Sequence, residues 1–121
     1  MPARQSPEDP ASLLPLRPVE LLLLSMLSAG DRHGYGLRQD IIDHTGGAIA
    51  LEAGTLYRHI RRLEDAHLVA EAGSREPEAD ERRIYYRLTP FGRKVLAAEM
   101  IRLRDLVRLA ERRRVISPAR S

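Results

Sequence analysis

Residues 54–64 (GTLYRHIRRLE) restrict the fold of this chain more than any other segment. Leu56, Ile60 and Leu63 are spaced by four and three residues, so on a helix they share one face that must be buried. The opposite face would carry the polar side chains Thr55, Arg58, His59 and Arg62. A short helix with a buried apolar face and exposed arginines suits the major groove of DNA.

Two further helical patterns precede this segment. The first begins at Pro18, because proline is favoured as the first residue of a helix, and its broad apolar stripe ends before Gly30. The second is predicted to end near His44, before a pair of glycines breaks the chain. The segment described above then forms the third helix, over about residues 53–66. Three short helices joined by tight turns predict a helix-turn-helix core.

Strand patterns follow this core. Residues 68–70 and 84–88 have strand character, and the charged residues between them predict a hairpin, which would be the wing of a winged helix. Thr89 can cap a last helix that begins at Pro90 and continues to about Val115. The predicted fold class is therefore mainly α (α+β), a winged helix-turn-helix with a C-terminal helix.

The last helix carries apolar residues spaced four, three, four and three apart, the spacing of a seam between two helices. They are Leu96, Met100, Leu103, Val107 and Ala110. The helix could fold back on its own domain or pair with a second copy. We favour a homodimer, because the helix is longer than one small core requires. Glu99 and Arg102, three residues apart, are expected to pair on the outside.

A chain of 121 residues fits one small domain. Its N-terminal residues combine several prolines with small and polar side chains, which disfavours regular structure. The expected organisation is a flexible N-terminal tail (1–16), a winged helix-turn-helix (17–89), a C-terminal dimerisation helix (90–116) and a short tail (117–121).

Composition excludes several classes of protein. The chain has no cysteine, which excludes disulfides and thiolate sites and fits a cytoplasmic protein. Its longest apolar run, residues 19–27, is too short to span a bilayer, so no membrane association is expected. The histidines lack ligand spacing, so we expect no metal and no cofactor. Enzyme motifs such as a phosphate-binding loop are absent, so we expect no enzymatic activity.

Basic residues are abundant but unevenly placed. The net charge is +3, and every basic residue except Lys94 is an arginine, a side chain that can bind phosphate or guanine in a bidentate manner. Codon usage in a GC-rich genome would give the same bias. Because the positive excess lies toward the C-terminus, an argument for DNA binding depends on where individual arginines point.

The order of these segments resembles the PadR family of bacterial transcriptional regulators. The motifs that carry the resemblance are His33-Gly34-Tyr35-Gly36-Leu37, Gly54-Thr55-Leu56-Tyr57, Arg62-Leu63-Glu64 with Leu68-Val69, and Tyr86-Arg87-Leu88-Thr89 with Gly92. The resemblance implies a homodimeric winged helix-turn-helix protein that binds a roughly palindromic double-stranded DNA operator. It also implies a repressor that a small-molecule effector can release, with the effector site between the subunits.

Three residues depart from the family pattern. Arg58 replaces a proline, His67 replaces the glycine that ends the recognition helix, and Glu52 replaces a serine-like cap. Histidine tolerates a left-handed conformation better than most residues, so His67 is compatible with the fold. Glu52 is a weaker cap than serine, although its charge suits a helix N-terminus.

The candidate DNA-binding residues follow from the exposed helix face and the resemblance. They are His33, Gly54, Thr55, Tyr57, Arg58, His59, Arg61 and Arg62, with Arg75, Arg82 and Arg83 in the wing. For Tyr57, a packed ring is as plausible as a phosphate contact. Tyr35, between two glycines, is expected to pack the second helix on the first. Two alternatives remain open, a winged-helix protein-interaction module and a ligand sensor that does not bind DNA.

Overall fold

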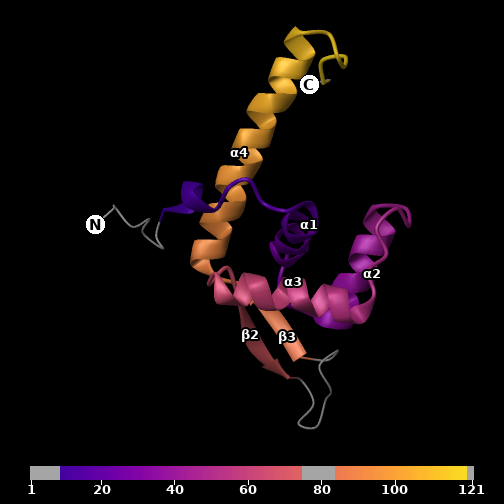
Figure 1. Cartoon of the computed structure of the whole chain (residues 1–121), viewed down its shortest axis with the longest axis vertical. Helices are drawn as coiled ribbons and strands as arrows, with labels where there is room; N and C mark the ends of the chain where they lie inside the picture. The colour runs from indigo at the N-terminus through magenta and orange to yellow at the C-terminus, as the bar shows by residue number, and fades with distance from the viewer. Residues whose placement is uncertain (1–8, 75–83, 120–121) are drawn as a thin grey trace.

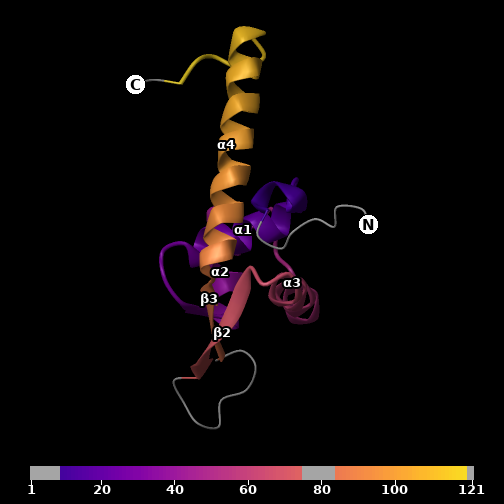
Figure 2. The ribbon, with the colours of Figure 1, turned by 90° about the vertical axis from the view of Figure 1, so that its left-hand side faces the viewer.

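The computed structural model describes residues 9–74 and 84–119. Its elements, in chain order, are the 3-10 helix η1 (Pro10–Leu13), α1 (Pro18–Leu27), β1 (Arg32–His33), α2 (Gly34–His44), α3 (Ala53–Asp65), β2 (Val69–Ser74), β3 (Ile84–Leu88) and α4 (Pro90–Arg112). Helices α1 to α3 and the sheet form one body, and α4 projects from it as a long rod (Figure 1). The β2–β3 hairpin extends from the same body in the opposite direction (Figure 2).

The ends of α1, α3 and α4 follow local sequence signals. Pro18 and Pro90 are the first residues of α1 and α4. Proline is suited to this position because a backbone N–H there would have no partner within the helix. The Thr89 hydroxyl accepts a hydrogen bond from the Gly92 amide at 2.8 Å and so caps α4. After α3, His67 has a φ of 64°, the left-handed conformation that commonly ends a helix. These observations confirm the predicted helix starts and the tolerance of histidine at position 67.

The core forms where the three helices and the sheet meet. Leu56, Ile60 and Leu63 of α3 are buried, which confirms the predicted inward face of this helix. The largest fully buried apolar side chains of the other helices are Leu23, Leu24, Leu37, Ile41 and Val95. Such a shared core fixes α3 against the rest of the domain, so its outer face has a defined position.

The sheet has three antiparallel strands in the order β1-β3-β2. The predicted hairpin is confirmed, with Val69 of β2 opposite Leu88 of β3. Strand β1 was not predicted from the sequence; it has only two residues and pairs Arg32 with Tyr86. A strand this short has no alternating pattern and exists only because β3 lies beside it.

The segment before α1 packs against α4 and corrects the predicted tail. Leu13, Leu14 and Leu16 are partly buried against the core, and η1 contacts α4. The Leu16 amide donates a hydrogen bond to the Glu99 carboxylate at 2.9 Å. The prediction of a flexible tail over residues 1–16 is therefore wrong for residues 9–16, and residues 1–8 lie outside the described part.

Helix α4 has two regions with different environments. Its first turns belong to the domain core, where Leu96 is buried, so Leu96 is not available as an interface residue. Glu99 is also buried and binds Arg102, which corrects the expectation of an exposed pair. Beyond this point the helix carries exposed apolar side chains and ends at Arg112, three residues before the predicted end. In residues 9–74 and 84–119 no helix combines the length and apolar character of a membrane span.

Candidate nucleic-acid interface

The outer face of α3 is exposed and rich in arginine. Arg58, Arg61 and Arg62 are exposed, and Thr55 is half-buried beside them. The Arg58 guanidinium donates a hydrogen bond to the Thr55 hydroxyl at 3.1 Å, which holds both groups at the start of the helix. Gly54 is exposed with open space where a side chain would stand. The first turn of α3 therefore presents small and hydrogen-bonding groups together with a guanidinium.

A hollow of about 520 Å³ lies along this face, and we call it the α3 hollow. Its lining residues are Arg17, Thr55, Arg58, His59, Arg61, Arg62 and Asp65. Guanidinium groups dominate the lining, so the hollow favours an anion. No cluster of histidine and carboxylate side chains suited to a metal ion occurs in the described ranges. Arg17 was not among the residues predicted from the sequence, because it precedes α1 and is distant from α3 along the chain.

His59 and Arg62 point partly inward, toward a buried carboxylate. Glu20 of α1 is 4% exposed, and its Oε2 atom accepts hydrogen bonds from His59 Nδ1 at 2.8 Å and Arg62 Nε at 2.9 Å. The expectation that His59 and Arg62 both face outward needs correction, because an unpaired buried carboxylate would be costly. The Arg62 side chain is still 53% exposed, so it supports the core and also lines the surface.

This dual position of Arg62 limits what its removal can reveal. Arg62→Ala would take away a surface charge and also one of the two hydrogen-bond donors of Glu20. A loss of DNA affinity in that variant could not be separated from a loss of stability. The Arg58 side chain makes a single hydrogen bond within residues 9–74 and 84–119, to the Thr55 hydroxyl on its own helix, so it is the better residue for a test.

Tyr57 is a packing residue. It is 5% exposed, and Gly34 of α2 lies against its ring so closely that a Cβ there would overlap the Tyr57 hydroxyl. Of the two roles considered for Tyr57, the packed ring is the one seen. The contact explains why glycine is needed at position 34 and fixes the distance between α2 and α3.

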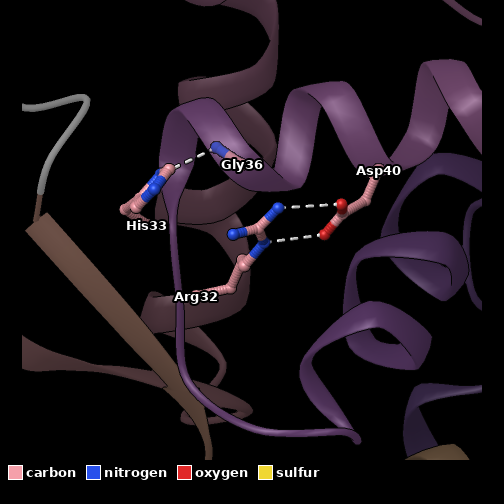
Figure 3. Close-up of polar contacts among 4 residues, drawn as sticks. All are labelled: Arg32, His33, Gly36 and Asp40. Carbon is pink, nitrogen blue, oxygen red and sulfur yellow. Dashed lines mark hydrogen bonds and ion pairs between the residues drawn. The ribbon is translucent and has the colours of Figure 1, made fainter.

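The entry to α2 is held by two side chains of β1 (Figure 3). His33 Nδ1 accepts a hydrogen bond from the Gly36 amide at 2.8 Å, so the proton of the neutral ring is on Nε2. Arg32 binds Asp40 through two hydrogen bonds of 3.0 and 3.1 Å, and the bond to Asp40 raises the pKa of Arg32. The main role of His33 in the fold is therefore to cap the N-terminus of α2. Its ring also contacts Tyr85 edge-on, with centroids 5.3 Å apart.

Tyr35 and the wing arginines are the remaining positions for which a role was predicted from the sequence. Tyr35, expected to pack between helices, is 51% exposed at the start of α2. The wing residues Arg75, Arg82 and Arg83 lie outside the described residues. The candidate surface is therefore built here from α3, from the start of α2 and from Arg17.

The helical core, the antiparallel hairpin and an exposed third helix define a winged helix-turn-helix protein. Residues 23–98 match the family described as "Transcriptional regulator PadR-like family". The match covers more than half of the chain, so the chain belongs to the PadR-like family of transcriptional regulators. The resemblance inferred from the sequence motifs is confirmed.

Solved structures of other proteins share the fold. A PadR family transcription regulator from Clostridium difficile is 26% identical, with a TM-score of 0.66 over 78% of this chain and 95% of that chain. A PadR family transcriptional regulator from Eggerthella lenta is 30% identical, with a TM-score of 0.63 over 85% and 82% of the two chains. Bacillus subtilis PadR, solved in complex with operator DNA, is 21% identical with a TM-score of 0.62, over 72% and 49%. These likenesses confirm the predicted winged-helix fold.

Proposed function

We propose that this transcriptional regulator binds a double-stranded DNA operator as a homodimer, with α3 of each copy in one half-site. The observation that carries the proposal is the exposed, arginine-lined face of α3 on a helix whose other face is fixed in the core. Arginine can bind the O6 and N7 atoms of guanine, the commonest specific contact in the major groove. The two half-sites would then lie about one helical turn apart.

The second copy is proposed to pack on α4. Met100, Val107 and Leu106 are 43, 45 and 53% exposed on a helix that projects from the domain. Leu103 and Ala110, which share the predicted seam, are half-buried. Burying this surface against an identical helix would remove apolar area from water, which is the main favourable term in association.

Regulation is proposed to follow from occupancy of the operator. A dimer bound over a promoter excludes other proteins from the same DNA, so we propose repression. A small-molecule effector, if one acts, would bind between the subunits near α4, where the apolar surfaces meet. The function needs no cofactor and no catalytic group, and we propose that it operates in the cytoplasm. The proposed units are residues 17–89 for DNA binding and 90–116 for dimerisation.

Arg58→Ala is expected to weaken binding to the preferred duplex without destabilising the protein. The probe is the duplex enriched by in vitro selection with the full chain, compared with a scrambled duplex of the same composition. Loss of one bidentate contact should reduce affinity for the selected duplex by about 10- to 100-fold. The melting temperature should remain unchanged, because Arg58 is exposed. Fluorescence anisotropy and thermal unfolding measure the two quantities.

Arg112→Ala is the matched control. It removes the same charge at the C-terminal end of α4, which is remote from α3 (Figure 1). It should leave DNA affinity unchanged. Equal affinity of the wild type and Arg58→Ala for the selected duplex would contradict the proposed role of α3. Failure of the wild type to enrich any duplex would favour a protein-interaction module or a ligand sensor instead.

A further inference from the structure

Arg17 has a backbone that is fixed from both sides. It is followed by Pro18, which restricts the preceding residue to extended conformations, and its φ and ψ are −67° and 144°. Its carbonyl accepts a hydrogen bond from the Leu21 amide at 2.8 Å in the first turn of α1. On the other side, the Leu16 amide is held by Glu99 of α4. The Arg17 side chain therefore projects from a backbone position that is fixed in the structure.

Glu99 anchors the backbone before Arg17 to α4. It is 1% exposed and accepts hydrogen bonds from Arg102 at 2.6 and 3.1 Å, in addition to the bond from Leu16. The hydrogen bond from Arg102 lowers the pKa of Glu99, so the carboxylate stays ionised and remains a strong acceptor. The anchor thus joins the segment that carries Arg17 to the helix proposed for dimerisation.

The Arg17 side chain lines the α3 hollow together with arginines of α3. Arg62 is bound to Glu20 and Arg58 to Thr55. By contrast, the Arg17 side chain has no hydrogen-bond or ion-pair partner among residues 9–74 and 84–119. Asp65 is the acidic residue among the described lining residues, and it is exposed. Several like charges around one hollow repel each other, and an anion placed among them relieves that repulsion.

We propose that Arg17 binds a phosphodiester of the DNA backbone at the edge of the groove that α3 occupies. The inference rests on the proposed function and extends the interface from α3 to the start of α1. An arginine can bind a phosphate in a bidentate manner, and such contacts set the register of a protein on DNA without reading sequence. Because the backbone of Arg17 is already fixed, little conformational entropy is lost when the contact with phosphate forms.

The test is a salt titration of Arg17→Ala on the selected duplex and on the scrambled duplex. Arg17→Ala is expected to lose about tenfold in affinity per chain on both duplexes at low salt. The slope of log affinity against log salt should become shallower by about 0.9 per chain. Arg17→Lys, which keeps the charge but not the bidentate geometry, should retain most of the slope and part of the affinity. Arg112→Ala should match the wild type on both duplexes.

The outcomes separate this inference from the proposed function. An unchanged salt slope in Arg17→Ala, together with a loss of selected binding in Arg58→Ala, would overturn the Arg17 contact and leave the role of α3 intact. A loss confined to the selected duplex would also overturn it, because Arg17 would then read a base. If the wild type binds neither duplex, both proposals fall. Should Arg17→Ala unfold at a lower temperature, Arg17→Gln, which keeps the aliphatic stem, replaces it in the same titration.

Discussion

Gly92→Ala is expected to lower the free energy of unfolding by about 3 kcal/mol, among the larger effects of a single substitution. Gly92 lies in the first turn of α4, where a Cβ would overlap the carbonyl oxygen of Leu68 and stand 2.9 Å from Leu88 Cδ1. The Leu68 carbonyl cannot move freely, because it accepts a hydrogen bond from the Thr89 amide at 3.0 Å. Thermal unfolding should record a fall in melting temperature of about 10 °C or more.

Gly54→Ala provides the comparison for this variant. Gly54 is also in the first turn of a helix, but nothing lies within 4 Å of its added Cβ. Alanine there should leave stability unchanged or raise it slightly, since alanine favours helix formation. A melting temperature of Gly92→Ala equal to that of the wild type would contradict the close packing of α4 on the chain before β2.

Leu103→Asp is expected to convert a dimer into monomers and to reduce affinity for the selected duplex by about 100-fold or more. Leu103 is half-buried on the seam of α4, where a carboxylate in the middle of an apolar helix pair would be unpaired. In a single copy the same carboxylate reaches water, so the monomer should stay folded. The DNA effect is large because two linked α3 helices bind one duplex far more tightly than one alone.

Light scattering gives the mass of the variant, and anisotropy gives its affinity. Ile101→Asp is the control, because Ile101 is 50% exposed and lies two positions away on a different side of α4. It should remain dimeric and keep its DNA affinity. If Leu103→Asp has the mass of the wild type, the second copy binds elsewhere and the proposed use of α4 is wrong.

The parts of the fold that depend on neighbouring residues could be predicted from the sequence. Pro18 and Thr89 mark helix starts through local backbone chemistry, and their positions agree with the structure. The inward face of α3 was also predictable, because the spacing of its apolar residues requires a common side. The exposed position of Arg58 follows from the same geometry.

The parts that depend on distant residues could not be predicted. Glu99 was expected on the outside of the last helix and no partner was predicted for Glu20, yet both are buried and bind residues of other segments. Glu20 binds His59, 39 positions away, and Glu99 binds Leu16, 83 positions away. No local pattern encodes such pairs, since each depends on how helices pack. Arg17 could not be predicted for the same reason, because it reaches the α3 hollow only when α1 packs on α3.

Two copies of the chain are proposed to bind one duplex together through the exposed faces of their α3 helices. Methylation interference on the selected duplex tests this claim most directly, because methyl groups on guanine N7 project into the major groove. We expect two groups of interfering guanines, related by two-fold symmetry and centred about 10 base pairs apart. A single group of interfering guanines, or none on a duplex that the protein still binds, would contradict this proposal.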